Sequence, residues 1–225
     1  MKLLIDSANI DSITKLADLF PITGVTTNPT ILFREKKDPW ESLLAIRKLI
    51  GNNLQLHSQV VSQKAEDMIE EAYYIKSRLG ENTFIKVPVS QQGLKAIRKL
   101  SSEGFHVTAT AIYTPVQALL AATAGAQWLA PYVNRLDMVG GNGVQVAGDI
   151  QKLLEKQHCA SAVLAASFKN VEQIFQVLLS GVQGITAAPD VIEALLNHPL
   201  TDKAIEDFTG DFEKLTSTGS TMIPH

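Results

Sequence analysis

The regular alternation of short β-rich runs with longer helical segments is the feature that most constrains the fold. Eight runs rich in apolar and β-branched residues cover 2–6, 22–28, 54–60, 83–89, 106–112, 127–133, 161–167 and 184–188. The segments between them carry helical spacing and helix-capping signals. Strands that alternate with helices pair in parallel through right-handed crossovers. Eight such units in 225 residues predict an α/β fold, a single-domain (β/α)8 TIM barrel.

Helix signals between the runs agree with this prediction. Asp38 and Thr114 each precede a proline, and Glu41 or Gln117 follows three residues after each of them, as in a capping box. An open, doubly wound sheet would give a similar alternation. Such a sheet more often carries a glycine-rich first turn, whereas the first turn here reads DSANID from residue 6.

The domain organisation follows from the uninterrupted alternation. No linker rich in Pro, Gly or Ser breaks the pattern, so we expect one domain over residues 1–225. After the eighth unit, an extra amphipathic helix is predicted at about 201–215, followed by a polar tail at 216–225. A helix beyond a completed barrel needs a surface to dock on, and a neighbouring subunit offers one. Whether the tail is ordered is left open.

Charge and composition exclude several classes of function. The formal net charge of -3 gives no long-range attraction to nucleic acid or to an anionic membrane. The single cysteine, Cys159, cannot form an intrachain disulfide, which favours a reducing compartment. No apolar run approaches the ~20 residues of a membrane span, and the N-terminus becomes polar too early for a signal peptide. We therefore expect a cytoplasmic protein that binds neither nucleic acid nor membrane.

Polar side chains stand at the ends of the predicted strands, where a barrel of this kind carries its reacting groups. They are Asp6, Thr26, Thr27, Asn28, Gln59, Lys86, Thr110, Tyr132, Arg135 and Ser167. This set contains no pair of carboxylates at glycosidase-like positions, and the five histidines are scattered without metal-ligand spacing. We therefore expect neither a metal nor another cofactor.

Lys86 is the residue with a chemical mechanism attached. It lies between Ile85 and Val87 in the run FIKVPVS, which otherwise reads as a buried strand. Burial disfavours the ammonium form, so the pKa can fall toward ~7 to 8 and leave a neutral amine that attacks a carbonyl to form a Schiff base. In the alternative, the lysine stem packs in the strand and its head pairs with a carboxylate such as Asp6. The strand context alone leaves both open.

Five short motifs resemble one known family in their order and spacing. They are GVTTNP at 24–29, KVPV at 86–89, TATAIY at 108–113, APYVNR at 130–135 and LAASFK at 164–169. Together they resemble the small transaldolase and fructose-6-phosphate aldolase family. The resemblance implies a (β/α)8 barrel, a Schiff-base lysine on the fourth strand, no metal, and a homo-oligomer that is a decamer of two pentamers, with the C-terminal helix reaching a neighbour.

The resemblance also assigns roles around the lysine. Lys86 matches the imine-forming lysine of the family. Asp6 matches the carboxylate near that amine, which takes part in proton transfer and holds substrate hydroxyls. Thr27 and Asn28 match the polar lining beside it.

The phosphate-binding groups and two departures complete the comparison. Arg135 and Ser167 match the groups that hold the phosphate of the aldehyde substrate, a task that suits a guanidinium fork and a hydroxyl. Thr108 stands where the family has a bulkier apolar residue, and TAAPDV at 186–191 shifts the proline of the last turn. Both departures flank the cavity, so they leave the donor and acceptor preferences open.

Two positions distinguish the branches of this family. Transaldolases have a glutamate at the end of the third strand and a phenylalanine in the sixth-strand motif, whereas this chain has Gln59 and Tyr132. The pairing resembles the aldolase branch, in which Gln59, Thr110 and Tyr132 hold a water molecule and the phenol acts as acid and base. Glutamine cannot take up a proton as a carboxylate does, but a phenol can donate and accept one.

These observations predict a class I aldolase that cleaves and forms fructose 6-phosphate from dihydroxyacetone and glyceraldehyde 3-phosphate. Its partners are then small ketose and aldose phosphates. A transaldolase, which passes the same three-carbon unit to another aldose phosphate, is the first alternative. The second is a non-catalytic barrel that binds phosphosugars and in which Lys86 is merely paired.

Overall fold

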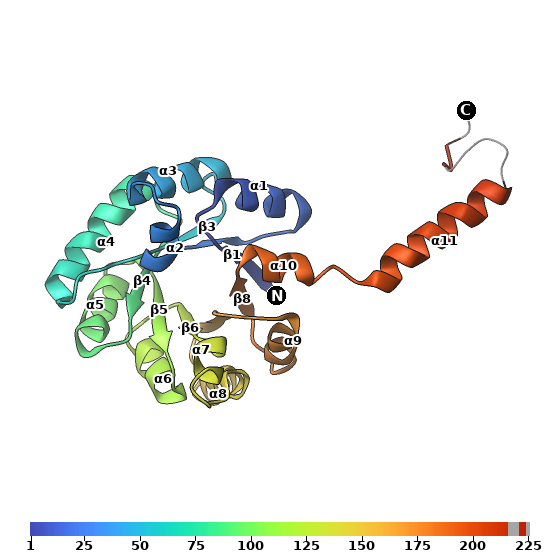
Figure 1. The fold of residues 1–225 in the computed structure, drawn as a ribbon. Coiled ribbons are helices and arrows are strands. Elements are labelled where there is room, and N and C mark those ends of the chain that lie inside the picture. Colours follow the sequence, from blue (N-terminus) through green and yellow to red (C-terminus); the bar gives the residue numbers. More distant parts are fainter. Residues whose placement is uncertain (216–220, 224–225) are drawn as a thin grey trace.

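Eight short strands close into a barrel in the computed structural model of this chain, which describes residues 1–215 and 221–223 (Figure 1). The strands are β1 (Lys2–Asp6), β2 (Gly24–Thr26), β3 (Gln55–Gln59), β4 (Thr83–Pro88), β5 (His106–Ile112), β6 (Trp128–Pro131), β7 (Ala162–Ala165) and β8 (Gly184–Ala187). Each strand pairs in parallel with the next, and β8 returns to pair in parallel with β1, where Ile5 lies opposite Ala187. The predicted (β/α)8 barrel is confirmed, and the open-sheet alternative is wrong.

Helices follow the strands in the chain and surround the barrel (Figure 1). The longer ones are α1 (Ile10–Leu19), α3 (Pro39–Ile50), α4 (Ala65–Leu79), α5 (Gln91–Ser102), α6 (Pro115–Thr123), α8 (Gly143–Lys156) and α9 (Val171–Leu179). The short helices α2 (Pro29–Arg34), α7 (Val133–Asp137) and α10 (Pro189–Ala194) begin within a few residues of the ends of β2, β6 and β8. Their position brings helix termini to the carboxyl end of the barrel.

Two helix starts that were predicted from sequence are confirmed. The Asp38 carboxylate accepts hydrogen bonds from the backbone N–H groups of Trp40 and Glu41 at the start of α3. At the start of α6, the Thr114 hydroxyl accepts from the backbone N–H of Gln117, whose side chain accepts from the backbone N–H of Thr114. Side-chain oxygens therefore satisfy donors that have no partner within a helix.

Apolar side chains are buried on both sides of the strands. The larger core lies between the strands and the helices, where Ile5, Ile85 and Val107 are fully buried. A smaller cluster consists of Leu4, Phe84, Trp128 and Leu164. Since these four residues alternate with the helix-facing ones, they fill the inside of the barrel toward the amino ends of the strands. They leave its carboxyl end to polar residues.

A bulge in β5 shapes the inner surface of the barrel. The pairing of β5 with β6 shifts register between Ala109 and Ile112, and Ala111 has a φ of 56° in the left-handed region. Such a conformation costs an alanine free energy that glycine would not pay, so it persists only where its surroundings hold it. The bulge lies next to Thr110, which is fully buried.

The last helix extends away from the barrel. α11 (Pro199–Leu215) has no buried residue, and Figure 1 shows it projecting beyond α10 and away from the strands. The predicted extra helix at about 201–215 is therefore confirmed and begins two residues earlier. Of the predicted tail at 216–225, residues 216–220 and 224–225 lie outside the described residues.

None of the helices in the described part of the chain is long and apolar enough to cross a membrane. The cytoplasmic location stays a prediction.

Candidate active site

The polar residues predicted at the strand ends gather at the carboxyl end of the barrel. Register pairing places Asp6 of β1 opposite Thr26 of β2, and Gln59 of β3 opposite Lys86 of β4. Because the strands are parallel and closed into a ring, all these ends meet at one mouth. The mouth contains a lysine surrounded by hydroxyl, amide and carboxylate groups.

Lys86 is buried and has a carbonyl partner. Only 5% of the residue is exposed, and its Nζ donates a hydrogen bond to the backbone oxygen of Thr27 at 2.8 Å. Burial lowers the pKa of the Lys86 amine below its ordinary value, the negative charge of Asp6 acts in the opposite direction, and the positive charge of Arg135 lowers the pKa further. The neutral amine is thereby favoured, and a neutral amine is the nucleophile in imine formation.

Asp6 is held by a hydroxyl group and not by the lysine. Its Oδ1 accepts a hydrogen bond from the Thr26 hydroxyl at 2.6 Å, and the Thr26 hydroxyl also contacts the Thr186 hydroxyl at 2.6 Å. No ion pair joins Asp6 to Lys86 among the described residues. The carboxylate partner that was considered for Lys86 from sequence is therefore replaced by the Thr27 carbonyl.

A phenol and a hydroxyl meet on the opposite side of the mouth. The Tyr132 hydroxyl lies 2.9 Å from the Thr110 hydroxyl, and the Tyr113 ring packs edge-on against the Tyr132 ring at 5.7 Å between centroids. The Arg135 guanidinium lies over the Tyr132 ring, with its Cζ 4.6 Å from the ring centroid. These contacts hold the Tyr132 ring in place and keep its oxygen next to the Thr110 hydroxyl.

Gln59 carries a buried acceptor without a partner. Its Oε1 makes no hydrogen bond within the described residues, and no hydrogen bond joins Gln59 to Thr110 or Tyr132 there. An unsatisfied buried acceptor costs about 1 to 3 kcal/mol, so such an atom in a native site is best explained by a ligand or water. Of the three residues predicted to hold a water molecule, two are in direct contact and the third offers a free acceptor.

Arg135 and Ser167 stand at the rim, on α7 and on the loop after β7. Arg135 is exposed on α7, while Ser167 follows β7 with a φ of 63° in the left-handed region. The Ser167 backbone oxygen accepts a hydrogen bond from the backbone N–H of Asn134 at 2.7 Å. Gln173 of α9 braces the same place, because its Nε2 donates to Asp137 Oδ2 at 2.7 Å. The strained serine is therefore held by α7, and α7 is in turn held by α9.

Asn28 and two residues that the sequence analysis did not single out complete the surroundings. Asn28 caps α2, since its Oδ1 accepts from the backbone N–H of Ile31 at 3.0 Å. Thr186 contacts Thr26, and His57 lies buried two residues before Gln59 on the same face of β3. The strand period of two could have indicated His57 as an inward-facing residue.

A groove of about 720 Å³ opens beside Gln59 on the outer surface. It runs between α2, α3 and α4, and its lining includes Leu32, Trp40 and Tyr74. Across residues 1–215 and 221–223, no three His, Cys, Asp or Glu side chains form a group that could hold a metal ion.

Comparison with known proteins gives two findings. Residues 3–222 match the family model described as Transaldolase/Fructose-6-phosphate aldolase. The chain is also 42% identical over 213 residues to a protein of Streptococcus pneumoniae (strain ATCC 700669 / Spain 23F-1) that is described as a probable fructose-6-phosphate aldolase. That match covers 94% of this chain and 96% of the relative.

Proposed function

The chain belongs to the transaldolase/fructose-6-phosphate aldolase family, and from that premise we propose that it is a class I aldolase that cleaves and forms fructose 6-phosphate. The observation that carries the proposal is the buried Lys86 amine, whose pKa is lowered by burial and whose Nζ is held by the Thr27 carbonyl. The name of the Streptococcus pneumoniae relative points to the same activity.

In the cleavage direction, the neutral Lys86 amine attacks the C2 carbonyl of the ketose, and loss of water gives a protonated imine. Tyr132, acting through a water held with Thr110 and Gln59, takes the proton of the C4 hydroxyl. The C3–C4 bond then breaks, its electron pair moves into the imine, and glyceraldehyde 3-phosphate leaves. Protonation of the resulting enamine at C3 and hydrolysis of the imine release dihydroxyacetone and restore the amine.

The remaining site residues bind and orient the substrate in this proposal. Arg135 and Ser167 at the rim hold the phosphate, since a guanidinium and a hydroxyl both donate to an oxyanion. Asp6, with Thr27 and Asn28 beside it, holds hydroxyls of the three-carbon unit near the amine. A buried lysine and an exposed arginine at the rim suit a substrate that carries a carbonyl and, further along, a charged phosphate.

Transaldolase activity is the alternative within the family. It uses the same imine but transfers the three-carbon unit to an aldose phosphate, and so it depends on an acceptor such as erythrose 4-phosphate. The residues Gln59 and Tyr132 favour the aldolase, because a glutamine with a free Oε1 can orient water but cannot act as its base. A phosphosugar-binding barrel without catalysis would bind ligand and never form a covalent adduct.

Borohydride reduction tests the proposal directly. The purified protein is reduced in the presence of dihydroxyacetone and, separately, of fructose 6-phosphate, and then analysed by intact mass and peptide mapping. A three-carbon adduct on Lys86 that is absent from Lys86→Met is the expected result. Lys152→Met, which removes an exposed lysine of α8, is the matched control and should still be trapped. An unmodified wild-type protein in both reactions would leave the non-catalytic barrel as the better explanation.

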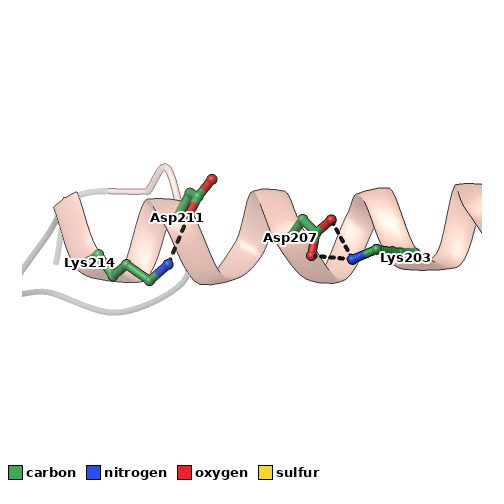
Figure 2. A network of polar contacts seen from close by, with 4 residues as sticks. All are labelled: Lys203, Asp207, Asp211 and Lys214. Atoms are coloured by element: carbon green, nitrogen blue, oxygen red, sulfur yellow. Dashed lines mark hydrogen bonds and ion pairs between the residues drawn. The ribbon is translucent and has the colours of Figure 1, made fainter.

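We also propose that the protein is a homo-oligomer in which α11 packs on another subunit, as the family resemblance implies for a decamer. α11 exposes Leu200, Ile205, Phe208 and Leu215, and helical spacing places the last three of them on one side of the helix. The ion pairs Lys203–Asp207 and Asp211–Lys214 run along the helix (Figure 2), and their spacing puts them on a different side from Ile205, Phe208 and Leu215. α11 has no buried residue in the described part of the chain, so its apolar side is available to a partner.

A further inference from the structure

His57 is a buried polar residue of the barrel for which the proposed reaction has no use. It is fully buried on β3, and so is its neighbour Thr108 on β5. The Thr108 hydroxyl lies 2.9 Å from His57 Nδ1, and His57 Nε2 lies 3.1 Å from Gln55 Oε1. The imidazole ring stacks on Phe84, at 4.6 Å between centroids and 8° between planes. The His57 side chain is therefore held on three sides.

The partners of His57 fix its protonation and the direction of its hydrogen bonds. Gln55 Oε1 can only accept, so His57 Nε2 carries the proton, and the lone pair of Nδ1 then accepts from the Thr108 hydroxyl. Burial, and in second place the positive charge of Lys86, hold the pKa of His57 well below its ordinary value. The ring is consequently neutral and in one tautomer.

The Thr108–His57 hydrogen bond crosses the inner face of β4 directly below the reactive lysine. β3 and β5 are the two neighbours of β4. His57 pairs in register with Phe84, and Thr108 pairs with Lys86, two residues further along β4 on the same face. The bond thus ties β3 to β5 between Phe84 and Lys86.

The backbone of His57 continues the connection to the amine. Its carbonyl oxygen accepts hydrogen bonds from both the N–H and the hydroxyl of Thr27, each at 2.9 Å. The Thr27 carbonyl in turn accepts from Lys86 Nζ at 2.8 Å. A chain of contacts therefore runs from Thr108 through His57 and Thr27 to the Lys86 amine, over four different strands or strand ends.

We propose that His57 is a positioning residue for the Lys86 amine: locked by Thr108 and Gln55, it fixes the point of β3 that holds Thr27, and Thr27 sets the position of the nucleophile. This inference rests on the proposed function, because it concerns the lysine that forms the imine. Burying the His57–Thr108 pair beside the apolar cluster of the barrel costs desolvation free energy. In our proposal, the pair offsets this cost by orienting the Lys86 amine.

Four variants test the role of His57. His57→Phe keeps the stacking ring but leaves the Thr108 hydroxyl buried and unpaired, and Thr108→Val removes the other partner. The double variant replaces both partners by apolar groups, which can be nearly neutral for stability. His106→Phe is the matched control, because His106 also stacks on Phe84, at 4.8 Å between centroids, and its Nδ1 lies 2.9 Å from Gln127 Oε1. Among the described residues, no hydrogen bond joins His106 to Thr27.

The measurements are kcat and KM for fructose 6-phosphate cleavage, the rate of borohydride trapping with dihydroxyacetone, and unfolding in urea. We expect His57→Phe to lower both kcat and the trapping rate by about 10- to 100-fold, because a reacting group misplaced by about 1 Å can cost that much. KM should change less than about threefold, since the phosphate is held elsewhere. His106→Phe should keep kcat within about twofold.

The double variant separates positioning from mere stability. Recovery of stability with kcat still low supports the inference, whereas recovery of both together overturns it, as does an unchanged kcat in His57→Phe. If the double variant stays destabilised, its trapping rate is measured where circular dichroism shows it folded: a reduced rate supports the inference and the wild-type rate overturns it. A wild-type protein that is never trapped overturns the proposed function as well, and that result is obtained before any variant is made.

Discussion

Lys86 shows how one buried residue can oppose stability while serving the proposed chemistry. Its position between two apolar strand residues indicated burial, and the low exposure of the side chain agrees with that. The partner of the amine, the Thr27 carbonyl, could not be predicted from sequence. It lies in the turn after β2, and only the closure of the barrel brings that turn close to Lys86. Gln59 was predicted at the mouth. That its Oε1 has no hydrogen-bond partner could not be predicted, because this depends on which donors the neighbouring strands place within reach.

We expect Lys86→Met to stabilise the protein at neutral pH by about 0.5 to 2 kcal/mol, the range common for relieving a functional residue. The folded pKa of this amine lies below that of the unfolded chain, so the unfolded state binds the proton more tightly. Wild-type stability contributed by this group therefore rises with pH between the folded pKa and the ordinary value of 10.5. Urea unfolding at a series of pH values should show the advantage of Lys86→Met shrinking as pH rises. An advantage that is absent or that grows with pH would contradict the prediction.

Gln59→Glu should shift the reaction from cleavage toward transfer. A carboxylate beside Lys86 can accept a proton from the bound water, which the amide cannot. The ratio of transfer to erythrose 4-phosphate over release of dihydroxyacetone, measured on the same enzyme sample, is expected to rise about tenfold or more, as general-base effects are commonly of that size or larger. Gln63→Glu, on the loop after β3, provides a charge-matched control. An unchanged ratio in Gln59→Glu would remove the physical basis for assigning the aldolase branch.

At the scale of the elements, helix starts were more predictable than strand irregularities. Asp38 and Thr114 indicated the starts of α3 and α6, because a capping residue acts on donors only two or three positions away. The bulge at Ala111 gave no such signal, since its left-handed backbone is imposed by the shifted pairing of β5 with β6. Local chemistry determines the first feature and the neighbouring strand the second.

The capping box of α6 provides a test at this scale. Thr114→Ala removes the acceptor for the Gln117 backbone N–H and is expected to lower the free energy of unfolding by about 1 kcal/mol, within a range of about 0.5 to 2. Thr114→Ser keeps the hydroxyl and should lose only a few tenths. Urea unfolding of both variants measures the difference. Equal loss in the two would show that the methyl group, and not the cap, matters.

For the whole molecule, the number of strands and their closure could be predicted, while the path of the last helix could not. The amphipathic pattern of residues 201–215 indicated a helix with one apolar side, but a pattern of this kind does not say which surface covers that side. In the structure, α11 has no buried residue and extends past α10, away from the barrel of its own chain (Figure 1). Assembly is therefore the property of the whole molecule that most needs measurement.

We expect Phe208→Glu to weaken assembly, since it puts a charge in the middle of the apolar side of α11, where Phe208 is 72% exposed in the single chain. Sedimentation velocity should show the wild-type protein as a large oligomer and the variant shifted to smaller species. Lys203→Gln, on a different side of the helix, makes the net charge more negative by the same one unit, so it is the charge-matched control and should keep the wild-type distribution. A monomeric wild-type protein, or a Phe208→Glu variant that sediments like wild type, would argue against packing of α11 on another subunit.

Because β1 pairs with β8, β1 stays without its second neighbouring strand for most of the synthesis of the chain. Strand β1 ends at Asp6, whereas its second neighbour begins at Gly184, so one edge of β1 stays open until most of the chain has been made. At translation rates of roughly 5 to 20 residues per second, that interval lasts on the order of 10 to 35 seconds. An exposed strand edge can template wrong pairing. Of the strand edges, the open edge of β1 is accordingly exposed to wrong pairing for the longest time during synthesis. A chaperone that covers this edge would act before β8 is made and the barrel closes.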